Sequence, residues 1–195
     1  MIIGITGSIG SGKTAAARLF SRHHFSIINA DEISHLLMKN NPDVKRILLK
    51  NFGNKILHGN KSIDRKKFGN IVFNNSKKLN KLNSIMHLLI LKEIKNKIIK
   101  IRRICGDDAK IIIDAPLLLE AKTKNFVDRI IVVKCDKKYI LKRLNKKFSE
   151  DKIKKILNAQ MPLKEKIKYA DFVMDNNGDL KHLEKQVMEI IKNLI

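Results

Sequence analysis

The sequence contains no tryptophan, and phenylalanine and tyrosine together make up only 5% of its 195 residues. Proteins that bind single-stranded nucleic acid stack bases on aromatic side chains, and neither that signature nor a recognition-helix motif occurs here. Acidic residues are also few, 19 against 41 lysines and arginines, which gives a formal net charge of +22. The excess is mostly lysine scattered over the whole chain, which AT-rich codon usage explains. We predict no nucleic-acid partner, and a positive field that attracts anionic substrates.

Cysteine is scarce, and long apolar runs are missing. Cys105 and Cys135 stand far apart without metal-ligand spacing, which predicts reduced, partly buried thiols. Runs such as 111–113 and 130–133 are far shorter than the roughly 20 residues that cross a bilayer. The N-terminus has no basic leader. We therefore expect a soluble, cytoplasmic protein that folds without disulfides, has no membrane partner and is a monomer.

A glycine-rich segment near the N-terminus carries the strongest functional signal. Residues 7–14 read Gly-Ser-Ile-Gly-Ser-Gly-Lys-Thr, between an apolar run and a helix-favouring stretch. This order is typical of a phosphate-binding P-loop, whose backbone N–H groups turn inward around a triphosphate. Lys13 then reaches the β- and γ-phosphates, and the Thr14 hydroxyl is the predicted Mg²⁺ ligand. The alternative is a glycine turn that binds nothing. The predicted ATP-binding residues here are Gly10, Ser11, Gly12, Lys13, Thr14 and Ala15.

Short apolar runs alternate with helical patterns along the chain, which predicts an α/β fold with a parallel sheet. The five candidate strands are 1–6, 26–29, 110–115, 129–134 and 171–174. About seventy residues between the second and third strands show no convincing strand and are predicted to form a helical insertion. One apolar stripe there indicates a long helix, and a second stripe predicts a helix over 180–194. The residues of the first stripe are Leu79, Leu82, Met86, Leu89, Ile90 and Ile94.

Three acidic residues follow or end predicted strands, where ligands of parallel sheets bind. Asp31 follows the second strand and is a candidate base for an attacking hydroxyl. Alternatively, it caps a helix that begins at Glu32. Asp114 ends the third strand, as an acid that orients Mg²⁺ would, although any strand-terminal turn can carry an aspartate. Glu120 is the third.

Several motifs, in order and at similar separations, resemble those of the dephospho-CoA kinase family over nearly the whole chain. They are residues 7–14, Asn-Ala-Asp at 29–31, Ile-Asp-Arg at 63–65, Met-His at 86–87, Pro-Leu-Leu-Leu-Glu at 116–120, Ala-Asp at 170–171 and Asp-Asn-Asn-Gly at 175–178. The Pro-Leu-Leu-x-Glu and Asn-Asn-Gly segments are peculiar to that family among P-loop proteins.

The resemblance implies a three-layer P-loop NTPase fold that transfers the ATP γ-phosphate, with Mg²⁺, to the ribose 3′-hydroxyl of dephospho-CoA. This is the last step of CoA synthesis. Asp31 matches the catalytic aspartate of the family. The resemblance also implies that the insertion, residues 36–105, is the CoA-binding lobe of a single domain. Residues 142–157 would form a lid, and Asn176 and Gly178 would lie near adenine.

Basic residues in the lid and the insertion are candidates for contacts with phosphate groups. Arg143, Lys146 and Lys147 lie where a closing flap would exclude water, and Arg143 is the predicted charge stabiliser of the transition state. The alternative for these residues is a solvated helix face. Arg65 and His87 are the predicted acceptor-binding residues, with surface charge and a partly buried core histidine as their alternatives.

The sequence departs from the family pattern at four positions. Asn29 replaces the first aspartate of an Asp-Ala-Asp triplet, so catalysis rests on Asp31 alone. Leu88 replaces a proline after the histidine and weakens the inference for His87. Lys147 and Phe148 replace an arginine and an aspartate of the lid, from which we expect slower or weaker closure.

Two rival functions stay open at this point. The nearer rival is another P-loop kinase that acts on a nucleoside or nucleotide with a different acceptor lobe. The second is a regulatory GTPase or a nucleic-acid-stimulated ATPase. Guanine selection usually needs an Asn-Lys-x-Asp turn, and the nearest segment, residues 145–148, ends in phenylalanine instead of the acid.

Overall fold

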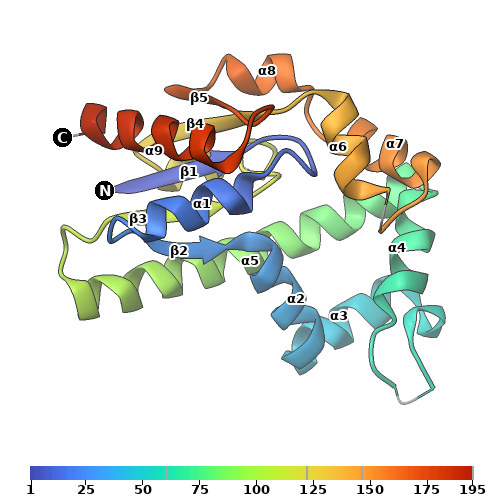
Figure 1. Cartoon of the computed structure of the whole chain (residues 1–195). Coiled ribbons are helices and arrows are strands. Elements are labelled where there is room, and N and C mark those ends of the chain that lie inside the picture. The colour runs from blue at the N-terminus through green and yellow to red at the C-terminus, as the bar shows by residue number, and fades with distance from the viewer. Residues whose placement is uncertain (60, 122, 146, 195) are drawn as a thin grey trace. The chain divides into compact units, whose positions relative to one another are not determined.

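The computed structural model describes residues 1–59, 61–121, 123–145 and 147–194. Its contacts divide the chain into two compact units, one of Met1–Asn29 with Lys97–Ile195 and one of Ala30–Asn96. The elements are labelled in Figure 1, and in chain order they are β1 (Ile2–Thr6), α1 (Lys13–Ser21), β2 (Ser26–Asn29), α2 (Ala30–Asn40), α3 (Pro42–Phe52), η1 (Asn54–Ile56), α4 (Arg65–Phe73), α5 (Ser76–Cys105), β3 (Ile111–Asp114), η2 (Thr123–Phe126), β4 (Arg129–Lys134), α6 (Lys137–Leu144), α7 (Glu150–Asn158), α8 (Leu163–Ile167), β5 (Phe172–Asp175) and α9 (Leu180–Leu194).

A parallel sheet forms the centre of the first unit. Its strand order is β2-β3-β1-β4-β5, and every neighbouring pair runs parallel. The five predicted strands are confirmed, with bounds that differ by at most one residue. Because all five strands run in the same direction, the loops that follow β1, β3, β4 and β5 emerge at one edge of the sheet. Polar and charged residues from distant parts of the sequence, which can bind a ligand or take part in catalysis, are brought together there.

Helices cover the sheet because its strands carry apolar side chains on both faces. Ile3 and Ile5 of β1 pack in one cluster with Phe20 of α1 and Val187 of α9. Figure 1 shows α1 and α9 running alongside the strands. Leu118, from the loop after β3, packs over Gly4, where a Cβ atom would overlap its side chain. The sheet is therefore buried, as parallel sheets require.

The second unit, Ala30–Asn96, is helical. Its core contains Val44, Leu48, Ile56, Phe68, Val72 and Met86. Among its described residues no strand occurs, and a single antiparallel bridge joins Leu57 to Ile63. The predicted long helix is confirmed as α5, in which Met86 and Ile94 of the apolar stripe are buried. The predicted insertion, residues 36–105, overlaps this unit but has different bounds.

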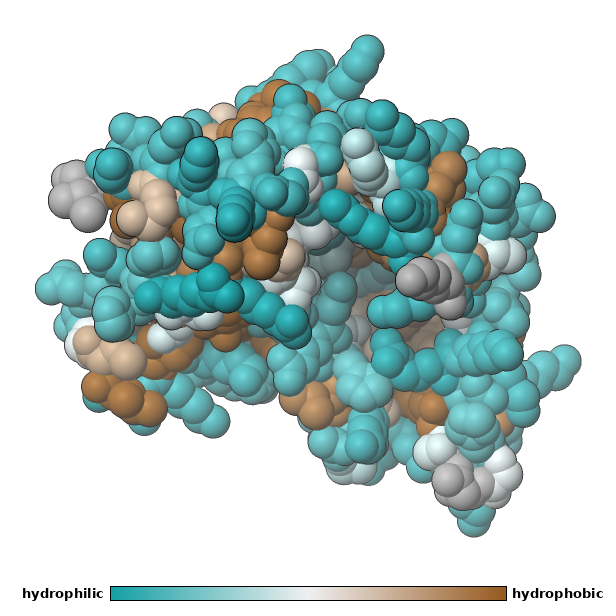
Figure 2. All heavy atoms as spheres, viewed as in Figure 1, coloured by the Kyte–Doolittle hydropathy of each residue, from teal (hydrophilic) through white to brown (hydrophobic). Residues whose placement is uncertain are grey.

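The surface matches the composition. The face in Figure 2 is largely hydrophilic, with hydrophobic side chains in scattered patches. Within the described residues, no helix combines the length and the apolar character that a membrane span needs.

Candidate active site

The segment between β1 and α1 has the backbone geometry of a phosphate cradle. Gly12 adopts φ 97° immediately before α1, and a Cβ atom at this position would overlap the Asn176 side chain. Gly7 adopts φ 149°, and its missing side chain leaves room for the carbonyl oxygen of Val133. Only glycine combines these backbone angles with such close approaches. The first turn of α1 carries no acidic residue, so the positive end of the helix faces the loop without a competing charge.

Two polar side chains of the loop fit a bound phosphate chain. Lys13 is buried, and its Nζ donates to the carbonyl oxygen of Ser8 at 2.8 Å, across the loop. The buried Ser11 hydroxyl has no hydrogen-bond partner within the part of the chain that the structure describes. A buried polar atom without a partner costs free energy, which a phosphate oxygen would recover. The loop is therefore suited to an anion.

An oxygen-rich pair lies beside the loop. The Thr14 hydroxyl donates to Oδ2 of Asp114 at 2.7 Å, and the Asn29 amide donates to the same oxygen at 3.2 Å. Burial raises the pKa of Asp114 above its ordinary value, while the Thr14 hydrogen bond and the Lys13 charge oppose that shift. A hydroxyl and a carboxylate at this distance suit Mg²⁺, which prefers oxygen ligands and takes the remainder from phosphates and water. Asn29 thus has a definite role as a donor to Asp114.

Arg143 and Asn176 hold the P-loop through hydrogen bonds to its backbone carbonyl oxygens. Nη1 of Arg143 donates to the carbonyl oxygens of Gly10 and Ser11 at 3.1 and 3.3 Å, and Nη2 donates to the Asn176 carbonyl at 3.1 Å. Asn176 Nδ2 donates to the Ser11 carbonyl at 2.6 Å. These bonds hold the carbonyl oxygens of Gly10 and Ser11 in place. The predicted role of Arg143 at the transition state stays a prediction, because its donors here serve the loop backbone.

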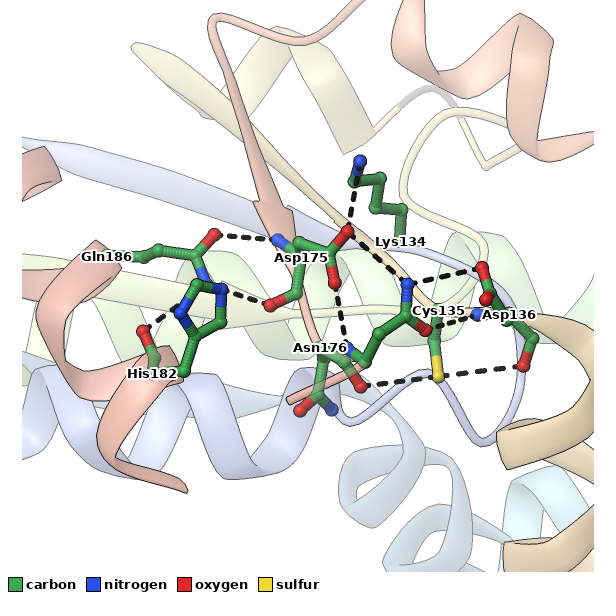
Figure 3. Close-up of polar contacts among 8 residues, drawn as sticks. Lys134, Cys135, Asp136, Asp175, Asn176, His182 and Gln186 are labelled. Atoms are coloured by element: carbon green, nitrogen blue, oxygen red, sulfur yellow. Dashed lines mark hydrogen bonds and ion pairs between the residues drawn. The ribbon is translucent and has the colours of Figure 1, made fainter. Parts of the chain in front are cut away.

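The ends of β4 and β5 form a second polar network, drawn in Figure 3. The Asn177 side chain accepts from the Asp136 backbone N–H at 2.7 Å, and Lys134 pairs with Asp175 at 3.0 Å. Gln186 of α9 accepts from the Asp175 N–H at 2.7 Å and donates to its carbonyl at 2.8 Å. The turn that carries Asn176 and Gly178 is thereby fixed against two strands and one helix. Its predicted place near adenine stays a prediction.

Comparison with known proteins identifies the family. A family model described as dephospho-CoA kinase matches residues 1–182. The chain belongs to the dephospho-CoA kinase family. A dephospho-CoA kinase from Carboxydothermus hydrogenoformans is 42% identical, covering 98% of this chain and 93% of the relative. One from Aquifex aeolicus is 36% identical, and the match covers 98% of this chain and 96% of the relative. The solved dephospho-CoA kinase from Campylobacter jejuni is 27% identical and has a TM-score of 0.68. That match covers 99% of this chain and 96% of the solved one.

Family membership makes the chain an ATP-dependent kinase and confirms the resemblance and the P-loop kinase fold predicted from the sequence. The alternative of another nucleoside or nucleotide kinase is not favoured, because near-full-length relatives share one name.

The residues assigned to the acceptor all lie in the helical unit. Asp31 is exposed in the first turn of α2, and because this helix begins at Ala30, the alternative in which Asp31 caps a helix that begins at Glu32 was wrong. Arg65 is the first residue of α4 and contacts Nδ1 of His35 at 2.5 Å. It also lines a hollow of about 200 Å³ with apolar residues such as Phe68 and Leu82. His87 is half-buried on α5. The roles of Asp31 as the base and of Arg65 and His87 as acceptor-binding residues stay predictions.

The predicted lid residues belong to α6, α7 and the segment between them. Ile140 and Leu144 of α6 pack against Ile153 of α7, and Ile9 of the P-loop joins this cluster. Phe148 packs there too, which explains an aromatic residue at a position where a charge was expected. Lys147 is exposed, and Lys146 lies outside the described residues.

The cysteines are both free thiols, as predicted. Burial raises the pKa of Cys135, whose thiol lies 3.4 Å from the Asn176 carbonyl, so it stays protonated. Cys105 is exposed, so the prediction of partial burial was wrong for it.

Sequence reasoning missed two side chains that hold the site. Gln160 Oε1 accepts from the Ile9 N–H at 3.0 Å, within the P-loop. Lys166 is completely buried behind the same loop and pairs with Glu120 at 3.0 Å. No local pattern points to either residue.

Proposed function

We propose that this kinase transfers the γ-phosphate of ATP to the ribose 3′-hydroxyl of dephospho-CoA, releasing ADP and CoA. The observation that carries the proposal is the cradle of residues 7–14, with Lys13 and the Thr14–Asp114 pair, in a chain of this family. The acceptor oxygen forms a bond to the γ-phosphorus while the bond to the β–γ bridging oxygen breaks.

The residues of the cradle bind and orient the triphosphate. Backbone N–H groups of residues 10–15 and the Lys13 ammonium neutralise charge on the β- and γ-phosphates. Thr14 and Asp114 are the groups that would hold Mg²⁺. When bound, that ion supplies charge neutralisation at the phosphate oxygens. Asn176 and Gly178, in the β5–α9 turn, border the nucleotide site. Arg143 turns toward the γ-phosphate when the lid closes.

Asp31 is proposed to accept the proton of the attacking hydroxyl. A carboxylate is the right group for this step, since it can accept a proton from a hydroxyl that lies within hydrogen-bond reach. Asp31 lies in the first turn of α2 and is exposed. Asn29 is an amide and cannot accept the proton, so Asp31 is the one carboxylate of the 29–31 segment.

The helical unit is proposed to bind the acceptor. Arg65 supplies a fork of donors for a phosphate of dephospho-CoA, and His87 a further contact. The hollow that Arg65 lines is apolar enough for an uncharged part of the same molecule. Small anionic substrates also agree with the net charge of +22. We place the enzyme in the cytoplasm as a monomer.

The decisive experiment is a kinase assay on the purified protein with ATP, Mg²⁺ and dephospho-CoA, with nucleosides and nucleoside monophosphates as competing acceptors. We expect mass spectrometry to find one added phosphate on the ribose of dephospho-CoA. Phosphorylation of a nucleotide, but never of dephospho-CoA, would overturn the proposal and revive the rival kinase. RNA-stimulated hydrolysis without an acceptor would revive the ATPase class.

Asp31→Asn tests the proton acceptor. The amide keeps the shape of the side chain but cannot take a proton, so we expect kcat to fall by about 10² to 10⁴ while the Kd for ATP stays unchanged. Glu32→Gln, the neighbouring exposed carboxylate on α2, is the matched control and should retain parental kcat. A loss below tenfold in Asp31→Asn would show that the proton leaves by another route.

A further inference from the structure

A buried lysine lies behind the cradle, outside the set of residues that bind the nucleotide. Lys166 of α8 has no exposed side-chain surface. Its ammonium donates to the Pro116 carbonyl at 2.5 Å and contacts both carboxylate oxygens of Glu120, at 3.0 and 3.3 Å. Thr6 Oγ1 lies 3.5 Å away. Burial lowers the pKa of Lys166, and the Glu120 charge opposes that shift.

The groups that the ammonium joins flank the nucleotide site. Thr6 directly precedes Gly7, the first residue of the cradle, and its hydroxyl donates to the Pro116 carbonyl at 3.2 Å. Pro116 stands two residues after Asp114, which accepts from Thr14. Lys166 therefore fastens the loop after β3 to the start of the P-loop, at the point where the two segments leave adjacent strands.

The same stretch of chain makes two further attachments. Gln160 accepts from the Ile9 N–H at 3.0 Å, and the Met161 N–H donates to Glu120 Oε1 at 2.8 Å. Residues 160–166 follow α7, the second helix of the predicted lid. This stretch, which we call the α7–α8 brace, thus holds both loops that carry Lys13, Thr14 and Asp114.

A buried ion pair is a weak source of stability. Desolvation of both charges offsets most of their attraction, and apolar replacements of similar volume are often neutral. Stability alone therefore does not account for a fully buried lysine here. Its three donors are instead directed at the two loops that must keep Asp114 beside Thr14, and a shift of about 1 Å in such groups can cost about 10² in rate.

We propose that Lys166 is a positioning residue for phosphoryl transfer: through Pro116, Thr6 and Glu120 it holds the loop after Asp114 against the P-loop, and turnover depends on that contact. The inference rests on the proposed function. ATP affinity depends much less on it, because Asn176 and Arg143, which lie outside the brace, also hold the cradle.

Two variants separate positioning from stability. Lys166→Met removes the ammonium but leaves Glu120 buried beside an apolar chain, so we expect both a lower melting temperature and a lower kcat. Lys166→Met combined with Glu120→Gln removes both charges, and the amide oxygen that replaces the carboxylate can still accept from the Met161 N–H. We expect this double variant to regain most of the parental melting temperature, because no unpaired charge remains.

The decisive readout is the split between kcat and ATP affinity in the double variant. We expect kcat about 10- to 100-fold below the parent, as for other residues that orient ligand-binding groups, with the Kd for ATP within about threefold. Lys166→Arg, which keeps the charge and the donors, should recover part of the lost kcat. Lys168→Met is the matched control, because the exposed Lys168 lies two residues further along the chain and pairs with Glu165.

Parental kcat in the double variant would overturn the inference, as would a loss of ATP affinity that matches the loss of kcat. These outcomes differ from a failure of the proposed function, in which the parent enzyme itself would not phosphorylate dephospho-CoA.

Discussion

At Gly12 a single missing side chain decides whether the cradle forms. Its φ of 97° lies in the left-handed region, and the Asn176 amide occupies the space where a Cβ atom would stand. Both facts act in the same direction. A larger residue must strain the backbone and also displace Asn176, whose Nδ2 bond to the Ser11 carbonyl shapes the loop.

We therefore predict that Gly12→Ala weakens ATP binding by at least about tenfold, measured by calorimetry, because strain and displacement together cost more than about 1.4 kcal/mol. Gly69→Ala is the matched control, because a Cβ atom there meets nothing closer than 3.9 Å and the position lies within α4. The control should keep ATP affinity and stabilise the fold by about 0.5 to 1 kcal/mol, the helix preference of alanine over glycine. Unchanged ATP affinity in Gly12→Ala would contradict the geometry of the cradle.

At the scale of one element, α4 depends on an acidic cap. The Asp64 carboxylate accepts from the N–H groups of Lys66 and Lys67 at 3.0 and 2.9 Å, and it lies 3.3 Å from the His58 ring. The backbone hydrogen bond from Lys67 holds the pKa of Asp64 below its ordinary value. Because Arg65 is the first residue of α4, this cap also positions a predicted acceptor-binding side chain.

The lowered pKa sets the sign of a pH dependence. The charged Asp64 cap contributes its full stability at pH values above about 3.9, the ordinary pKa of this carboxyl in the unfolded chain. That contribution is lost as the pH falls through the lower pKa that the carboxyl has in the folded protein. We predict that Asp64→Asn, which still caps but carries no charge, melts below the parent at about pH 7 and that the difference shrinks as the pH falls below about 4. Thermal unfolding followed by circular dichroism measures this.

Asn41→Ala is the comparison, since it removes a neutral cap from α3. It should cost about 1 kcal/mol at every pH. A difference between parent and Asp64→Asn that stays constant over the same pH range would show that the charge contributes nothing.

At the scale of the whole molecule, the dominant quantity is the formal charge of +22. Charges of one sign repel in the compact state, and salt screens them over a Debye length of about 10 Å at 0.1 M. We predict that raising sodium chloride from about 0.05 to about 0.5 M at neutral pH raises the melting temperature by several degrees. The salt effect should nearly disappear close to the isoelectric point of 10.1. A melting temperature that falls with salt at neutral pH would mean that attractive ion pairs dominate instead.

Local signals determined much of the fold and part of the site. The five strands were predictable because each is a short apolar run, rich in β-branched residues in all but β5, and α5 because its apolar residues recur every three or four positions. The P-loop was predictable because its glycines, lysine and threonine are consecutive. The start of α2 was not, since Asp31 has the residue type of a cap but the helix begins at Ala30.

The sequence by itself determined the α/β class, the cradle and the family, because these depend on the order and spacing of neighbouring residues. Only the tertiary structure decided what holds the cradle in place. Asn176 and Ser11 are 165 positions apart, and Lys166 and Thr6 are 160 apart. Parallel strands brought these residues to one edge of the sheet, where low dielectric and specific hydrogen-bond geometry, not sequence proximity, select the partner.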